Sequence, residues 1–232
     1  MPPLNLVGDY GGDSMLLLVG VLAALVERTS SGRGQVVDAA MVDGVSSLLA
    51  LTHGLLAAGV WREERGVNLL DGGAPYYRTY RCADGGYVAV GAIEDRFWAE
   101  LVRVLDPDLT GVADRADPTS WPLLGARLAA AFAARPRDEW AEVFEGVDAC
   151  VTPVLTFTES AGHPQVGGRG AVTSSGRGLA PGAAPRFSRT PGQAGDAARA
   201  AGADTREALL DWGFPAADVD DLLATGAAVQ IS

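Results

Sequence analysis

The chain has 232 residues, with 18 basic and 29 acidic side chains, and its formal charge is −11. All the basic residues are arginines, scattered singly or in loose pairs. A protein that follows a phosphate backbone or an anionic bilayer needs clustered positive charge, so this balance excludes nucleic acid and disfavours a membrane surface as partners. With 48% hydrophobic residues, the chain has enough apolar material for a globular core.

Cysteine usage and the N-terminal residues predict a reduced, cytoplasmic protein. Cys82 and Cys150 lie far apart, outside any CxxC or Cys/His cluster, and we interpret both as packing residues rather than metal ligands. The longest apolar run, Met15–Val26, has 12 residues, fewer than the roughly 20 that cross a bilayer. Met1–Leu4 lacks the basic region and small-residue cleavage site of a signal peptide.

The chain is expected to begin with a strand that runs into a helix. Leu4–Val7 is a short apolar stretch followed by the turn sequence Gly8–Gly12. Asp13 or Ser14 is then placed to cap a buried helix over Met15–Glu27, in which Gly20 lets a neighbouring segment approach closely.

Two more elements are predicted before the first domain boundary. Gln35–Ala39 is typical of a brief strand, and Met41–Val60 of a second apolar helix, which carries His53. The segment Trp61–Pro75 is first charged and then Gly-rich, and it marks the boundary.

The middle of the chain predicts a small α+β unit. Two β-prone runs, Tyr76–Arg81 and Tyr87–Val90, flank the turn sequence Ala83–Gly86, which is a hairpin signal. Further elements are expected at Asp95–Leu105 (a helix capped by Asp95), from Ser120 to Ala134 (helix), at Arg137–Phe144 (helix, with Trp140 inward) and at Val151–Leu155 (strand).

The C-terminal part predicts an extended excursion followed by two short helices. Gly167–Gly195 is rich in Gly, Pro and Arg and has no regular periodicity. Asp204–Glu207 has the sequence of a capping box that opens a helix to Trp212. A last helix, capped by Asp218 or Asp220, is expected to end near Thr225.

Two carboxylates stand out by position alone. Asp9 and Glu94 each follow an apolar strand-like run, where α/β folds place functional groups. The local pattern alone favours the simpler roles, with Asp9 as a helix cap and Glu94 as a solvated loop acid. Gly11 and Gly12 are either simple turn residues or expose backbone N–H groups at a helix N-terminus, which is a ready anion site.

The two histidines do not suggest a catalytic role by their context. His53 lies on an apolar helix, where a core or interface histidine is the commoner case, and His163 precedes Pro164 in a Gly-rich loop typical of a surface. The sequence contains no nucleophile elbow and no paired metal-ligand spacing.

Seven segments carry a resemblance that covers nearly the whole chain, in order: Leu4–Gly12, Gly32–Asp38, Leu69–Tyr77, Val90–Glu94, Asp148–Val154, Pro185–Pro191 and Gly202–Thr205. In sequence and spacing they resemble the family III CoA-transferases (CaiB/BaiF-like), and within them the α-methylacyl-CoA racemase branch.

The resemblance implies a site and a reaction. Asp9 matches the aspartate that, with a histidine from earlier in the chain, flanks the α-carbon of a 2-methylacyl-CoA thioester; one base removes the α-proton and the other returns a proton on the opposite face. Glu94 matches the acid that orients that histidine. Tyr10, Gly11 and Gly12 are then substrate-binding, because their backbone N–H groups would hold the enolate oxygen.

The resemblance also implies the fold and the partners. The fold class is α/β: residues 1–70 would be the remnant of a large nucleotide-binding-type domain with linker helices, 71–160 a small α+β domain, and 161–232 a segment returning to the large domain. The chain begins eight residues before Asp9, so the earlier part of the large domain, with the partner histidine, is expected to be absent. His53 and His163 do not match that position.

No metal or redox cofactor is implied, CoA enters as part of the acyl-CoA substrate, and intact relatives form homodimers. Met15, Leu16 and Tyr77 are candidate lining residues of the acyl pocket. Three functions stay open: a racemase acting through an enolate, a CoA-transferase in which Asp9 forms a mixed anhydride, and a non-catalytic fragment that docks onto a complementary chain and would expose apolar faces when alone.

Overall fold

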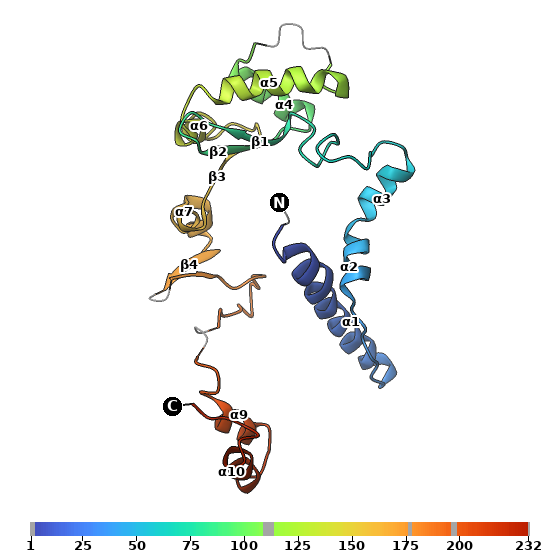
Figure 1. Cartoon of the computed structure of the whole chain (residues 1–232), viewed down its shortest axis with the longest axis vertical. Helices are drawn as coiled ribbons and strands as arrows, with labels where there is room; N and C mark the ends of the chain where they lie inside the picture. Colours follow the sequence, from blue (N-terminus) through green and yellow to red (C-terminus); the bar gives the residue numbers. More distant parts are fainter. Residues whose placement is uncertain (1–2, 109–113, 176–177, 196–198, 232) are drawn as a thin grey trace. The chain divides into compact units, whose positions relative to one another are not determined.

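The computed structural model describes residues 3–108, 114–175, 178–195 and 199–231. The chain divides into two compact units, 1–154 and 155–232 (Figure 1). The finer division into 1–70, 71–160 and 161–232 stays a prediction.

The N-terminal segment is helical from its start. A π-helical element, η1 (Leu6–Ser14), runs directly into α1 (Met15–Ser31). The predicted helix is confirmed, and it is longer than expected, but the predicted strand at Leu4–Val7 is wrong. A strand must pair its backbone N–H and C=O groups with a neighbour. Since the described residues offer this segment no partner strand, it satisfies those groups within a helix.

The next segment packs against α1 without forming a strand. Gln35–Ala39 is irregular, which corrects the predicted strand. A Cβ atom on Gly20 would lie 2.7 Å from a γ-carbon of Val37, so the expected close approach at Gly20 is confirmed. The single helix predicted over Met41–Val60 is two helices, α2 (Met41–Leu48) and α3 (Ala50–Ala57), separated at Leu49.

Helix length changes the expectation about membranes. The continuous helix Leu6–Ser31 has 26 residues and is long and apolar enough, by length and composition only, to cross a bilayer. The helix is longer than the 12-residue apolar run because η1 adds helical residues in front of it, and the absence of a membrane span stays a prediction.

The predicted small α+β unit is confirmed in its elements. The hairpin strands β1 (Tyr77–Arg81) and β2 (Tyr87–Gly91) pair antiparallel, and β3 (Val151–Val154) joins the other edge of β2, giving the order β1-β2-β3. Pro153 is accommodated because β3 is an edge strand. The helices are α4 (Asp95–Leu105), the 3₁₀ turn η2 (Pro118–Ser120), α5 (Trp121–Phe132) and α6 (Arg137–Val143).

The hydrophobic core lies between this sheet and its helices, and α4 and α5 cover one face of the sheet (Figure 1). Tyr80, Val88 and Val90 point into it from alternate strand positions, as the two-residue period requires. Phe132 is fully buried, with its ring stacked on Tyr80 at 5.1 Å between centroids. The inward orientation predicted for Trp140 is confirmed: it is buried and its indole N–H donates to the Phe132 carbonyl oxygen at 2.9 Å.

The second unit contains more regular structure than its sequence predicts. Its elements are α7 (Phe157–Gly162), α8 (Pro164–Gly168), the hairpin β4 (Val172–Ser175) and β5 (Gly178–Pro181), α9 (Thr205–Asp211) and α10 (Ala216–Ala224). The hairpin corrects the extended excursion expected over Gly167–Gly195. The N-cap of α10 is Pro215 rather than Asp218 or Asp220.

Several helix caps differ from the predicted ones. The capping box predicted at Asp204–Glu207 does not form, because the Asp204 carboxylate makes no cap hydrogen bond and pairs with Arg199 instead. A complete capping box is present at the start of α7, between Thr156 and Glu159. At α4 the N-cap is Glu94 rather than Asp95.

The two cysteines differ in environment. Both are free thiols; Cys82 is buried, as predicted, whereas Cys150 is exposed, which corrects its assignment to packing. Burial raises the pKa of the Cys82 thiol.

Candidate functional site

Asp9 lies in the first turn of η1, with its side chain exposed. The expected turn between a strand and a helix is therefore a π-helical turn, a geometry that recurs at functional sites. Partial positive charge at a helix N-terminus interacts favourably with a carboxylate in the first turn. Asp9 is thus accessible to a ligand and held on a helix rather than on a loop.

Tyr10 and Gly12, which follow Asp9 in η1, have different environments. Tyr10 is exposed, and its backbone N–H donates to the Asn5 carbonyl oxygen at 3.2 Å, so this donor is already engaged within the helix. Gly12 is buried where η1 crosses α2: a Cβ atom on Gly44 would lie 1.6 Å from the Gly12 carbonyl oxygen. The Gly12–Gly44 contact therefore has no room for side chains, and the structure gives Gly12 a packing role; its role in substrate binding stays a prediction.

Gly11 is half-buried beside the same contact, with Leu48 near its Cα. A cavity of about 320 Å³ opens next to it and is lined by Gly12, Leu16 and Asp43, among others. Leu16, a candidate for the acyl-pocket lining, thus faces a cavity; Met15 is exposed.

Glu94 is placed by the hairpin and the helix that follows it. It is the exposed N-cap residue of α4, directly after β2. Partial burial, together with the negative charges of Asp148 and Glu94, raises the pKa of the Cys150 thiol, which places Glu94 within electrostatic reach of Cys150. Cys150 has a backbone φ of 51°, a left-handed conformation that is uncommon for a residue other than glycine.

A second cavity, of about 380 Å³, opens on the sheet. Its lining includes Tyr77, Gly91 and Cys150. Tyr77, the third candidate for the acyl-pocket lining, therefore faces a cavity, and Cys150 of the same lining lies within electrostatic reach of Glu94.

Asp9 and Glu94 are not joined in the part of the chain that the structure describes. Neither makes a hydrogen bond or ion pair with the other. Asp9 lies in η1, which packs against α2, and Glu94 lies at the start of α4, after the strand β2. The two predicted catalytic carboxylates therefore lie in different elements and do not contact each other.

The histidines lie away from both carboxylate regions in sequence and element. His53 is exposed on α3, which contradicts the core position, and the interface position stays a prediction. His163 is the half-buried N-cap residue of α8 in the second unit, and its Nδ1 is buried without a hydrogen-bond partner in the described residues. Among those residues, no group of three or more His, Cys, Asp or Glu side chains gathers closely enough to hold a metal ion.

Sequence reasoning missed a hydrogen-bonded loop built on Asn68 and Asp71. Asn68 is buried, and its side chain accepts from the Arg62 backbone N–H at 2.8 Å and donates to the Arg62 carbonyl oxygen at 3.0 Å. Asp71 accepts from the backbone N–H groups of Gly66, Asn68 and Gly73 and from the Asn68 amide.

The electrostatics of this loop follow from its hydrogen bonds. Burial raises the pKa of the Asp71 carboxyl, but the hydrogen bonds from Asn68, Gly73 and Gly66 lower it more, and the net shift is downward. A charged, multiply bonded Asp71 fixes the loop on which Arg62 stands. The only sequence signal for it was the Asn and Asp pair three residues apart in a Gly-rich segment.

Comparison with known proteins identifies relatives over most of the chain. It is 41% identical to a mouse α-methylacyl-CoA racemase over 92% of its length and 56% of that protein, and 40% identical to the human α-methylacyl-CoA racemase over 82% of its length and 50% of that protein. A Caenorhabditis elegans CaiB/baiF CoA-transferase family protein is 31% identical over 75% of the chain. The chain therefore spans about half the length of the curated relatives it matches.

Solved structures give the same fold. A hypothetical protein, Rv3272, from Mycobacterium tuberculosis matches with a TM-score of 0.59 and 22% identity over 82% of this chain and 50% of that one. A CAIB/BAIF family protein from Brucella suis matches with a TM-score of 0.58 and 22% identity over 78% of this chain and 48% of its own. The predicted mixed α/β fold class, with only part of the family's fold covered, is confirmed.

The sequence pattern described as CoA-transferase family III matches residues 3–205, a span that includes both Asp9 and Glu94. By this match and by its similarity to the mammalian proteins, the chain belongs to CoA-transferase family III.

Proposed function

We propose that this chain carries the aspartate half of an α-methylacyl-CoA racemase-type site, which interconverts the (R) and (S) epimers of a 2-methylacyl-CoA. The observation that carries the proposal is the 40–41% identity to two α-methylacyl-CoA racemases over 82–92% of the chain. The exposed position of Asp9 in the first turn of η1 supports it, because a base must reach its substrate.

The chemistry is a balanced proton exchange. The Asp9 carboxylate takes the α-proton, the C–H electron pair moves to the thioester, and the carbonyl oxygen becomes an enolate. A proton delivered to the opposite face of the α-carbon gives the other epimer, and Asp9 releases its own proton to solvent. No electron leaves the substrate, so the reaction calls for no redox cofactor, and CoA participates only as part of the thioester.

Hydrogen bonds to the enolate would come from donors other than the Tyr10 backbone N–H, which is already engaged within the helix. Hydrogen-bond donors held in place around a developing oxyanion supply much of the rate enhancement in such reactions. The first backbone N–H groups of a helix have no intrahelical partner, and Asp9 lies in that turn of η1. Glu94 would act as a positioning residue for the second base.

The test is deuterium incorporation at the α-carbon of a 2-methylacyl-CoA in D₂O, followed by NMR. Asp9→Asn should abolish exchange, whereas Asp13→Asn, the same change of charge four residues along the helix, should leave it at the wild-type rate. Wild-type protein that is folded yet exchanges no deuterium would overturn the proposal for this chain.

A CoA-transferase activity is the second candidate, favoured by the family description and by the similarity to the C. elegans CaiB/baiF CoA-transferase family protein. In this reaction a carboxylate oxygen of Asp9 attacks the thioester carbonyl carbon, the C–S bond breaks, and CoA leaves as its thiolate. Hydroxylamine would convert the resulting mixed anhydride into a hydroxamate at Asp9, detectable by mass spectrometry. Proton exchange without such an adduct favours the racemase.

A third candidate, a fragment that docks onto a complementary chain, is favoured by the exposure of α1, in which no described side chain is buried. We expect protein rather than lipid to cover this helix. Its uncharged stretch, 14–26, spans about 20 Å at 1.5 Å per residue, short of the roughly 30 Å hydrocarbon core. Separately from this candidate, we propose a homodimer, as the resemblance to intact relatives implies, and a cytoplasmic location.

Sedimentation distinguishes these cases. Self-association that Leu18→Glu and Leu22→Glu remove would support a protein-covered helix, because both side chains are about half exposed on α1. Flotation with neutral phosphatidylcholine vesicles would contradict it.

A further inference from the structure

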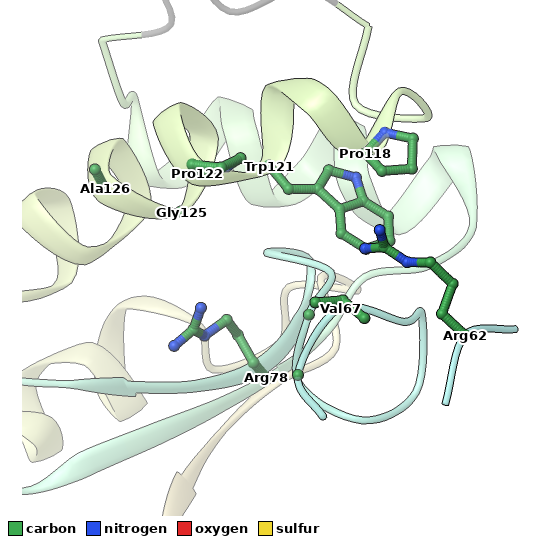
Figure 2. A pocket seen from close by; sticks show the side chains of 10 residues that line it. Arg62, Val67, Arg78, Pro118, Trp121, Pro122, Gly125 and Ala126 are labelled. Atoms are coloured by element: carbon green, nitrogen blue, oxygen red, sulfur yellow. The ribbon is translucent and has the colours of Figure 1, made fainter. Parts of the chain in front are cut away.

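A cavity of about 350 Å³ lies under the first turns of α5, apart from both predicted catalytic carboxylates (Figure 2). Its lining comes from two parts of the first unit: the loop 62–73 with strand β1, and the start of α5. A volume of this size accommodates a ligand as large as a mononucleotide.

Two guanidinium groups give this cavity a positive charge within a protein of net charge −11. Figure 2 shows Arg62 reaching toward Trp121 and Arg78 extending under Gly125. In the part of the chain that the structure describes, neither arginine forms an ion pair with a carboxylate, although six other arginines do. The N-terminal end of α5, where Trp121 and Pro122 line the cavity, adds partial positive charge.

The backbone of Arg62 is held in place, and the guanidinium group of Arg78 lies over an aromatic ring. The buried Asn68 side chain binds both backbone polar groups of Arg62, and Asp71 fixes the rest of that loop, including Gly66 and Gly73 of the cavity wall. The Arg78 guanidinium carbon lies 5.5 Å from the centroid of the Tyr80 ring. Two placed guanidinium groups match the oxygen pairs of phosphates better than a mobile lysine does.

Between the two arginines the cavity is bounded by an aromatic ring and by a glycine that packing does not require. Trp121 donates its indole N–H to the Arg115 carbonyl oxygen at 2.8 Å, which fixes the ring. Gly125 is in the interior of α5, where glycine is unfavourable relative to alanine. A Cβ atom there would make only ordinary contacts, 3.8 Å to Pro75 and 3.9 Å to Arg78. Its missing side chain enlarges the cavity.

We propose that this cavity binds the phosphorylated nucleoside group of a small ligand, with phosphate oxygens on Arg62 and Arg78 and the base against Trp121. The shared chemistry is an aromatic base joined to phosphate, which a free nucleotide and the nucleotide end of a CoA thioester both offer. The site stands on its own residues and does not depend on the proposed racemase activity.

The test is ADP binding to the full 232-residue chain, measured by calorimetry and by tryptophan fluorescence. Arg62→Gln and Arg78→Gln should each weaken binding by about tenfold or more, since each removes a charge-assisted contact. Arg65→Gln and Arg81→Gln make the same charge change on neighbouring residues that do not line the cavity, and they should leave the affinity within twofold. Equal losses in all four variants would overturn the site.

Gly125 provides a test that leaves the charge unchanged. Gly125→Ala should raise the melting temperature and Gly125→Leu should abolish ADP binding, because the longer side chain fills the cavity. Unchanged ADP binding by a folded Gly125→Leu variant would contradict the proposal.

Further ligands distinguish a free nucleotide from the nucleotide end of a CoA thioester as the molecule that the cavity binds. Inorganic phosphate binding as tightly as ADP would contradict the role of Trp121. Tighter binding of CoA than of ADP would assign the site to the thioester's nucleotide end, and the reverse order to a free nucleotide. The readout is binding rather than turnover, so its failure and a failure of the racemase proposal are separate results.

Discussion

The helices around the three-stranded sheet and the helices of the N-terminal segment are built from similar residues but are packed very differently. Leu124 and Leu128 of α5 are completely buried, whereas Leu22 and Leu25 of α1 are each about half exposed. The first region folds around a sheet that supplies its partner surface. In the second, the partner surface is limited to the crossing of η1 with α2 and to the approach of Val37 to Gly20, so apolar composition alone does not determine burial.

This difference indicates where the chain is self-sufficient. The region 74–154 contains a continuous core of aromatic and aliphatic side chains. The helix α1 owes its form to local helix-favouring residues such as Leu and Ala. Most helical stability in proteins comes instead from packing an apolar face. The exposed apolar face of α1 therefore agrees with the proposal that a protein partner covers it.

The largest expected effect is in the core. Phe132→Ala should lower the free energy of unfolding by about 3–5 kcal/mol, because it removes a ring that packs on Tyr80, Trp140 and Phe144. Leu22→Ala in α1 should change it by less than about 0.5 kcal/mol. Urea unfolding followed by tryptophan fluorescence compares them, and equal losses would show that α1 is packed as tightly as the core.

A smaller effect is expected at the helix crossing. Gly44→Ala would place a methyl group on the Gly12 carbonyl oxygen and should cost about 1–3 kcal/mol, with faster hydrogen exchange in η1 and α2. Gly54→Ala in α3 meets open space and should stabilise the helix by up to about 1 kcal/mol. Exchange rates unchanged by Gly44→Ala would mean that η1 and α2 are not in contact in solution.

The smallest effect is expected in the loop 62–73, which connects the two regions. Asp71→Asn should destabilise the loop 62–73 by about 1–2 kcal/mol at pH 7, since it weakens several hydrogen bonds to one carboxylate. The pKa of Asp71 is lowered in the folded protein, so its stabilisation is complete above about pH 4 and is lost as the pH falls further.

The measurement is the difference in urea midpoint between wild type and Asp71→Asn from pH 7 to pH 3, with the exposed Asp211→Asn as control. The difference should shrink toward pH 3. A difference that stays constant with pH would mean that the Asp71 charge does not hold this loop.

Local sequence signals predicted elements best where their partners are close along the chain. The hairpin around Ala83–Gly86 and the helices after it formed as expected, because turn chemistry and helix periodicity act over a few residues. The strands at Leu4–Val7 and Gln35–Ala39 failed because a strand also needs a neighbour that this chain does not provide in its described part. The predicted capping box at Asp204 failed because Arg199 binds its carboxylate.

The candidate site shows the same division. Asp9 and Glu94 were identified from motifs, yet their settings, a π-helical turn and a helix N-cap, came from the structure. The Asn68 and Asp71 network and the cavity under α5 had no motif, because their residues converge only when loop, strand and helix pack together.

The sequence by itself therefore determined the family and the helices of the small α+β unit, and it singled out the two candidate carboxylates, since each depends on residue type and short spacing. Only the tertiary structure decided which apolar faces are buried, that Gly12 and Gly44 meet backbone to backbone, and that two arginines share one cavity. These features depend on contacts between segments distant in sequence, which no local pattern specifies.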